Sequence, residues 1–161
     1  MYEFMVWLQR STLGHAMRES GVWTYGVVNL FHILGVATLF GSVLVLDLRL
    51  LGVWRHVALP AISKPTVPLA ATGFAIAAAS GVCLLATKAT EYIGNPFLYI
   101  KFPAIGLGLL NVAVLSRLPA WRQQANRDLS PREQARLRVF GGISLACWLT
   151  AISAGRMIGY W

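Results

Sequence analysis

The chain has 161 residues, of which 57% are hydrophobic and only 12% are charged. Its length suits one domain, but about a quarter of the residues in a soluble domain are charged, so lipid is the expected solvent. The net charge of +8 does not indicate nucleic-acid binding, because most basic residues lie in short segments between apolar runs, where cytoplasmic Lys and Arg flank membrane helices.

The first expected element is a short helix over about residues 4–19. The apolar residues Trp7, Leu8, Leu13 and Met17 are interspersed here with the charged residues Arg10, Arg18 and Glu19. A short segment that combines aromatic and aliphatic residues with basic ones is typical of an amphipathic helix that lies on a membrane surface. We therefore predict a surface helix before the first membrane span.

Four apolar runs then follow one another along the chain. Each run is about 20 residues long, which is the length a helix needs to cross a hydrocarbon layer of about 30 Å. Helices are expected because an isolated span must satisfy its own backbone hydrogen bonds. The prediction is an all-α, integral membrane four-helix bundle that forms a single transmembrane domain over 1–161, with spans at about 22–46, 67–87, 96–116 and 139–158.

Several helix starts carry recognisable signals. Pro65 and Pro68 are expected to bracket the start of the second span, and residues 95–96 (Asn-Pro) open the third with proline in its first turn. Ser130 and Glu133 have the spacing of a capping box. They predict a helix that begins near 130 and continues into the fourth span.

The basic residues are distributed unevenly between the two ends of the bundle. The loops after the first and third spans hold Arg49, Arg55, Lys64, Arg117, Arg122, Arg127, Arg132, Arg136 and Arg138. The opposite side holds Arg10, Arg18, Lys88, Lys101 and Arg156. By the positive-inside rule the two loops are cytoplasmic. We therefore expect a multi-pass protein of the bacterial inner membrane with periplasmic N- and C-termini.

His32 lies inside the first span, about ten residues and roughly 12 to 15 Å from its outer end. An ionisable group at this depth is costly unless it faces protein, a cofactor or a water cavity. Small or polar residues share its helical stripe at spacings of three and four: Tyr25, Asn29, Gly35, Thr38 and Ser42. Gly35 leaves room beside the imidazole, as a flat macrocycle or a close-packed neighbouring helix would require.

Two cations are expected in the same outer half of the bundle. Lys101 lies about one and a half turns below the outer interface in the third span, and Arg156 lies at a similar depth in the fourth. An axial histidine below two cations suits a haem, because haem propionates are anionic. Lys101, if burial deprotonates its amine, or Met157 are candidates for the second axial ligand.

Structural interpretations of these residues remain open. An intramembrane histidine is often hydrogen-bonded to a neighbour, and Asn29 and Thr38 are the candidates for His32. Lys101 and Arg156 can extend to the interface with no other role. These interpretations and the ligand interpretation are about equally supported by the residues alone.

Structural roles are preferred for the remaining polar residues. Asp47 and Arg49 are expected to anchor the inner end of the first span, with Asp47 paired to a basic residue of the second cytoplasmic loop. Cys83 and Cys147 differ in expected depth by roughly 10 Å, which is too far for a disulfide. His15 is expected at the surface, where it could also cap the site from above.

Three stretches resemble an uncharacterised family of small bacterial integral membrane proteins. They are LQRSTLGHAMRES, FHILGVATLFGSVLVLDLRLLG and NPFLYIKFPAIGLGLLN. In that family an acidic residue often precedes the histidine by one helical turn, and Asn29 occupies this position here. The resemblance implies the membrane-bundle fold and brings no activity with it.

Two shorter stretches, HILG and YIKFPAIGLGLLN, are similar to the membrane-bound, oxygen-independent protoporphyrinogen oxidase of bacterial haem synthesis. That resemblance implies that His32 and Lys101 serve a b-type haem. The CopD-type copper-resistance membrane proteins share this style of helix. Porphyrin oxidation is not implied, because the other polar positions of the oxidase have no clear match in this chain.

The sequence therefore predicts a b-type haem in the outer half of the bundle, used in electron transfer or haem-dependent oxidation. A periplasmic cytochrome or a quinone is the expected electron partner. One alternative is a non-catalytic accessory subunit of a larger respiratory or photosynthetic membrane complex, and assembly into an oligomer stays an open alternative. Another is copper handling, for which the soft ligands would be His15, Met17 and Met157.

Overall fold

The computed structural model describes residues 2–125 and 127–161, and all regular structure in these residues is helical. Four helices are long and apolar enough to cross a membrane. Only 17% to 33% of the residues in their apolar windows are buried inside the protein, so their outer surfaces are apolar as well. The four predicted spans are thus confirmed as helices: α3 (Gly21–Leu51), α4 (Leu59–Thr87), α5 (Pro96–Leu115) and α7 (Pro131–Met157).

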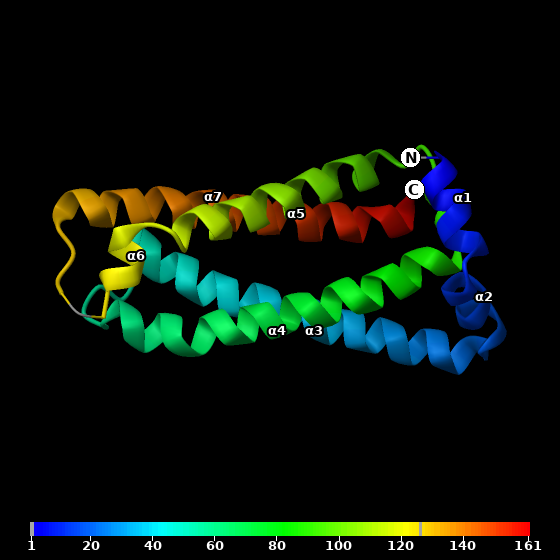
Figure 1. Ribbon diagram of the computed structural model, residues 1–161, viewed down its shortest axis with the longest axis horizontal. Helices are drawn as coiled ribbons and strands as arrows, with labels where there is room; N and C mark the ends of the chain where they lie inside the picture. The colour runs from blue at the N-terminus through cyan, green and yellow to red at the C-terminus, as the bar shows by residue number, and fades with distance from the viewer. Residues whose placement is uncertain (1, 126) are drawn as a thin grey trace.

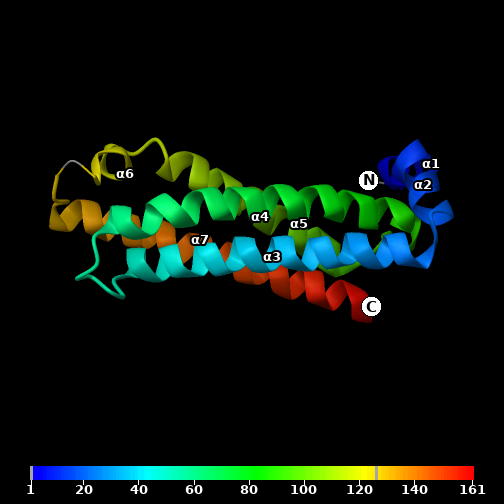
Figure 2. The ribbon, with the colours of Figure 1, turned by 90° about the horizontal axis from the view of Figure 1, so that it is seen from below.

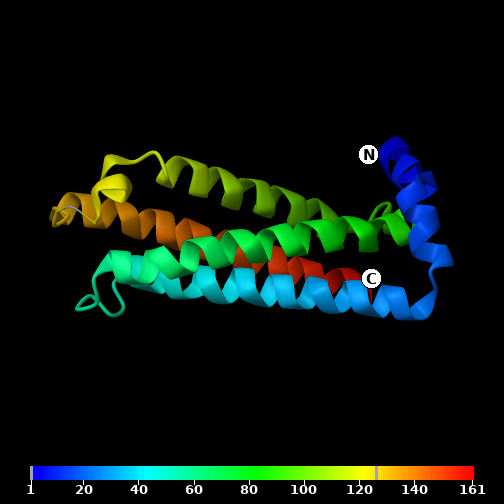
Figure 3. The same cartoon turned by 60° about the horizontal axis from the view of Figure 1, so that its bottom comes forward.

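Shorter helices occupy the two ends of the bundle (Figure 1). Two N-terminal helices run across the end where both termini lie, and Figure 3 shows them transverse to the long helices. A further short helix and the α3–α4 and α5–α7 connections lie at the opposite end. The short elements are α1 (Tyr2–Arg10), α2 (Thr12–Glu19), η1 (Ala89–Tyr92), α6 (Pro119–Gln123) and η2 (Ile158–Tyr160).

The long helices form two antiparallel pairs. Helix α3 packs along α4, helix α5 packs along α7, and contacts between α3 and α7 join the pairs. Figures 1 and 2 both show α3 and α4 side by side. In Figure 1 the two pairs diverge towards the end that holds the termini. The main contact between the pairs therefore lies in the half of the bundle near the α3–α4 loop.

The backbones of α3 and α4 touch at a pair of glycines. A Cβ added to Gly35 would lie 2.7 Å from the Ala77 nitrogen, and one added to Gly73 would lie 2.5 Å from the Leu39 nitrogen. Helices associate in lipid mainly by such close packing, since apolar side chains gain little from leaving the lipid. This contact is the physical reason for the dense small residues of α4.

Three apolar clusters fill the interior at different heights. The first packs α1 against the ends of α4 and α5, and it contains Met5, Leu8, Ala86, Ala89 and Leu98. The second closes the opposite end and contains Leu50, Leu59, Leu115, Ala120 and Leu137. Between them lie Leu39, Val43 and Trp148. The Trp148 ring meets Phe74 edge-on at 6.1 Å between centroids.

Two predicted helix boundaries were wrong. Helix α4 begins at Leu59, so Pro65 and Pro68 lie inside it. Each of these interior prolines lacks the N–H that would bond to the carbonyl four residues earlier, yet α4 continues through both of them. The predicted surface helix over 4–19 is instead two helices, because the Ser11 hydroxyl accepts a hydrogen bond from the Gly14 nitrogen at 3.2 Å and starts α2.

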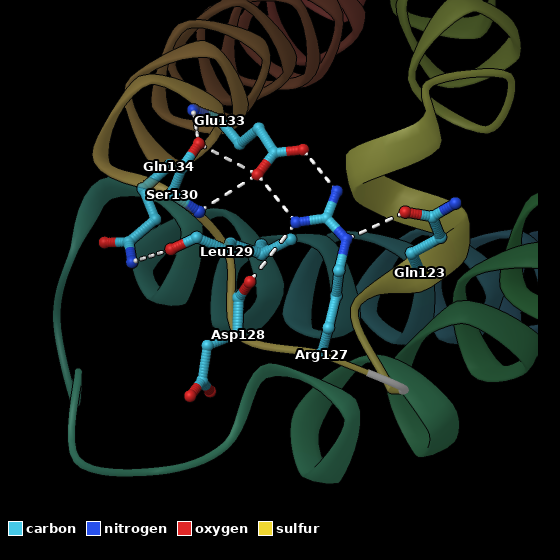
Figure 4. Close-up of polar contacts among 7 residues, drawn as sticks. All are labelled: Gln123, Arg127, Asp128, Leu129, Ser130, Glu133 and Gln134. Carbon is cyan, nitrogen blue, oxygen red and sulfur yellow. Dashed lines mark hydrogen bonds and ion pairs between the residues drawn. The ribbon is translucent and has the colours of Figure 1, made fainter.

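The predicted starts of the last two long helices are confirmed. The Asn95 side chain accepts a hydrogen bond from the Phe97 nitrogen at 3.0 Å. The Ser130 hydroxyl accepts one from the Glu133 nitrogen at 3.3 Å, and the Glu133 carboxylate accepts one from the Ser130 nitrogen at 2.9 Å. This reciprocal capping box, drawn in Figure 4, fixes where α7 begins.

Replacing Ser130 with alanine is expected to lower the free energy of unfolding by about 1 kcal/mol, because one half of the capping box is lost. Thermal unfolding of the detergent-solubilised protein would measure the change. Ser116→Ala is the matched control, since that hydroxyl only donates to the Ala113 carbonyl at the exposed end of α5. Equal losses in the two variants would contradict the assigned role of the cap.

Candidate functional site

His32 is half-buried on α3 and faces α4. Its Nδ1 atom lies 2.9 Å from the Ala77 carbonyl oxygen and 3.1 Å from the Ser80 hydroxyl. The imidazole edge lies against Gly81, where an added Cβ would stand 3.1 Å from Cε1. The histidine is therefore hydrogen-bonded to a neighbouring helix, and the predicted partners Asn29 and Thr38, on its own helix, were wrong.

The hydrogen bond to a carbonyl assigns the tautomer of His32. A carbonyl oxygen can only accept, so Nδ1 donates to Ala77 and carries the hydrogen. The lone pair of Nε2 is then available. Histidines that bind metals usually donate their other ring N–H to a carbonyl or carboxylate in this way, which fixes the ring and raises its basicity. In this tautomer Nε2 is the ring nitrogen that can accept a hydrogen bond or bind a metal.

Of the two predicted cations, the structure brings only Lys101 towards His32. The Lys101 side chain is half-buried, and its Nζ lies against Gly155 of α7, 3.4 Å from where a Cβ would stand. It is the charged side chain that acts on His32 electrostatically. Arg156 is exposed instead, with its guanidinium 4.5 Å from the Tyr160 ring centroid and bonded to the Tyr160 hydroxyl.

The remaining predicted site residues have different environments. Gly35 provides close packing against α4, which is one of the two alternatives drawn from the sequence. Asn29 is half-buried one turn before His32. Met157 is 43% exposed at the end of α7. Among the residues that were predicted to accompany His32, Lys101 is therefore the one retained as a candidate.

No compact metal cluster accompanies these residues. Within residues 2–125 and 127–161, no three His, Cys, Asp or Glu side chains form a group that could hold a metal ion. Met17 is buried, whereas His15 is exposed. Cys83 and Cys147 are both free, as predicted.

The prediction that Asp47 pairs with a basic loop residue was wrong. Its side chain is only 3% exposed, and its Oδ2 atom has no hydrogen-bond partner among the described residues. It lies against α7, with Ser144 beside its carboxyl group and its own carbonyl near Gly141. The expected pairing with a basic loop residue is absent from the described part of the chain. The cause is helix length, since α3 continues to Leu51 and keeps Asp47 inside the bundle.

Further buried polar groups lie around Asp47 in the same half of the bundle. The Asn111 amide donates to the Phe140 carbonyl at 3.0 Å. Ser144 is 5% exposed, and the indole nitrogen of Trp148, one turn further along α7, has no partner among the described residues. An intramembrane ionisable residue is a candidate functional residue by default. The sequence signal for it was a lone acid four residues before the end of an apolar helix.

Comparison with known proteins gives one family. A family described as "Family of unknown function (DUF6644)" matches residues 4–161, which is nearly the whole chain. No curated protein and no solved structure matches. The resemblance to the protoporphyrinogen oxidase and the CopD-type proteins thus gains no support from these comparisons.

Proposed function

The chain belongs to DUF6644, a family of unknown function, and we propose from the geometry at His32 that the protein binds b-type haem in the half of the bundle near its termini. Fold and family membership cannot supply the activity, so the argument rests on the site. The proposed role is electron transfer or a haem-dependent oxidation.

The observation that carries this proposal is the pairing of His32 Nδ1 with the Ala77 carbonyl at 2.9 Å. It holds the ring in one orientation and leaves Nε2 as the ligating atom. The chemistry of this donor fits an axial haem ligand. When bound, haem would supply one-electron redox chemistry at a potential set by its ligands, burial and nearby charge.

Lys101 has a supporting role in this proposal. Its half-buried ammonium lies at the Gly155 backbone of α7, across the bundle from α4. A cation there would bind an anionic propionate through charge-assisted hydrogen bonds. Arg156 is omitted from the proposed site because its guanidinium packs on Tyr160.

The membrane orientation forms part of the proposal. Arginines gather at the end with the α3–α4 and α5–α7 connections, which supports a cytoplasmic position for that end. The termini and His32 would then face the periplasmic half of a bacterial inner membrane. A periplasmic cytochrome or a membrane quinone would be the electron partner.

The test is a visible absorption spectrum of the detergent-purified protein, oxidised and dithionite-reduced, after expression with added haem precursor. We expect a Soret band and sharp reduced bands in the wild type, and their loss in His32→Ala. His15→Ala is the matched control, because His15 is exposed on α2. Its spectrum should equal that of the wild type.

Two results would overturn the haem proposal. One is a colourless wild-type protein despite ample haem, which would favour the accessory-subunit alternative. The other is a Soret band that survives in His32→Ala. Circular dichroism of the variant would establish that a lost band reflects a lost ligand and not a lost fold.

A further inference from the structure

We propose that a cavity at the end of the bundle opposite the termini binds a phosphate group. The cavity has a volume of about 310 Å³ and lies between the α3–α4 loop and the segment that joins α6 to α7. We call it the arginine cavity after the side chains that line it, which include Arg49, Arg55, His56, Arg127, Asp128 and Arg138. It lies at the C-terminal end of α3, about five helical turns from His32, and does not depend on the proposed haem.

One of the four arginines already has its charge paired. The Arg127 guanidinium donates to both carboxylate oxygens of Glu133, at 2.9 and 2.6 Å, and its Nε donates to Gln123 at 2.8 Å (Figure 4). The Glu133 hydrogen bonds raise the pKa of the Arg127 guanidinium above its usual value. Arg127 is therefore held in place at the edge of the cavity, and its positive charge is largely balanced by Glu133.

The other three arginines have no acidic partner among the described residues. Arg49 donates from Nε to the Val57 carbonyl at 2.8 Å, and Arg55 from Nε to the Gly52 carbonyl at 3.2 Å. These bonds hold the loop but leave the positive charges in place. The acid that lines the cavity, Asp128, is exposed and forms no ion pair within 2–125 and 127–161.

Positive charge therefore accumulates around the arginine cavity. Arg55 acts on Arg49 as a like-charged neighbour, and Arg138 adds a third guanidinium from α7. Like charges held close together repel, most strongly where water is partly excluded. A bound anion would offset this repulsion. Arginines with no anion to bind would be expected to extend away from one another into water.

The chemistry of the lining selects phosphate among anions. Guanidinium groups match phosphate oxygens with paired, charge-assisted hydrogen bonds. The start of α4 at Leu59 also borders the cavity, and its cap residue Ala58 offers no side-chain acceptor. Pro60 has no N–H, and the Ala61 nitrogen already donates to the Ala58 carbonyl at 3.0 Å, so the helix start contributes mainly through its dipole. A phosphate there would benefit from the positive end of the helix as well.

Two sources can supply this phosphate. One is a soluble phosphate ester that enters from the aqueous side. The other is the headgroup of an anionic phospholipid, since basic pockets at the ends of membrane helices bind such headgroups. Both would place the same group against Arg49, Arg55 and Arg138.

The test measures the melting temperature and the binding affinity of the full chain in nanodiscs. Inorganic phosphate and glycerol 3-phosphate are titrated into phosphatidylcholine nanodiscs, and phosphatidylglycerol is introduced into a second nanodisc series. We expect Arg138→Gln to lower the affinity for the ligand that binds the wild type by at least about tenfold, which is the usual cost of losing one charge-assisted hydrogen bond. Arg136→Gln is the matched control, because it removes the same charge from an exposed position on α7 that does not line the cavity.

A response to the soluble phosphates supports a phosphate-ester site, and a response to phosphatidylglycerol alone supports a lipid site. No response in the wild type, or equal weakening in Arg138→Gln and Arg136→Gln, would overturn the proposal in favour of diffuse surface charge. If Arg138→Gln does not fold, Arg138→Lys is used instead, because it keeps the positive charge and removes only the paired N–H donors of the guanidinium. It should bind more weakly than wild type, and unchanged binding would again overturn the site.

Discussion

Replacing Gly73 with alanine is expected to lower the free energy of unfolding by at least about 2 kcal/mol, although only one methyl group is added. The new Cβ would stand 2.5 Å from the Leu39 nitrogen and 2.8 Å from the Gly35 oxygen, both backbone atoms of α3. A flexible side chain could rotate away, but a helix backbone has to move as a unit. Overpacking of a tight interior typically costs about 1 to 3 kcal/mol, and α4 would have to shift along its whole contact with α3.

Gly41→Ala provides a control with the opposite sign. No atom lies within 4 Å of a Cβ at Gly41, which is also on α3. Alanine should stabilise that position by about 0.5 to 1 kcal/mol, because glycine in a helix interior is unfavourable. Unfolding of both variants in detergent micelles, followed by circular dichroism, measures the difference. If the two variants had equal stability, the backbones of α3 and α4 could not be in contact.

The same glycine contact also bears on the proposed haem site. Ala77 meets Gly35 through its nitrogen and accepts from His32 through its oxygen. A wedge between the helices at Gly35 would therefore lengthen the hydrogen bond that orients His32. We expect Gly35→Ala to weaken both the fold and any Soret band, whereas Gly41→Ala should leave the band unchanged.

The spans were predictable because lipid imposes strong local rules. A helix of about 20 apolar residues satisfies its own hydrogen bonds in hydrocarbon, and this requirement is visible in the sequence without knowledge of the neighbours. The caps at Asn95 and Ser130 were predictable because each is a local contact between residues two or three positions apart. The α4 start was missed because Pro65 and Pro68 are local stop signals that the helix tolerates.

The partners within the candidate site were less predictable, because they depend on the register between helices. The depth of His32 followed from its position in the span, but its partners Ala77 and Ser80 lie 45 and 48 residues away in sequence. The expected direction of the fourth span placed Arg156 near the same end of the bundle as His32, but it did not show that the guanidinium would pack on Tyr160. Tyr160 lies four residues after Arg156, a spacing at which side chains on one helical turn meet.

Replacing Asp47 with asparagine is expected to raise the stability of the bundle by about 1 kcal/mol or more, against the usual direction of core substitutions. The carboxyl group is almost fully buried, and its Oδ2 atom has no partner among the described residues. Burial of an unpaired charge or acceptor is costly. An asparagine amide has nearly the same shape and carries no charge, and its carbonyl oxygen can still accept from Ser144. Its N–H groups replace the unpaired Oδ2, so the expected gain is the burial cost of the charge less the smaller burial cost of these donors.

Asp128→Asn is the matched control for this prediction, since Asp128 is exposed and its stability effect should stay within about 0.5 kcal/mol. Chemical unfolding of both variants beside the wild type gives the comparison. A loss of stability in Asp47→Asn would mean that the native carboxylate gains from an interaction with bound water, a cation or a proton donor at Ser144 and Trp148. A gain would mean that the acid persists at a cost to the fold, as intramembrane ionisable residues do when function requires them. The buried polar groups around Asp47, together with His32, would then be the place to look for the chemistry of this protein.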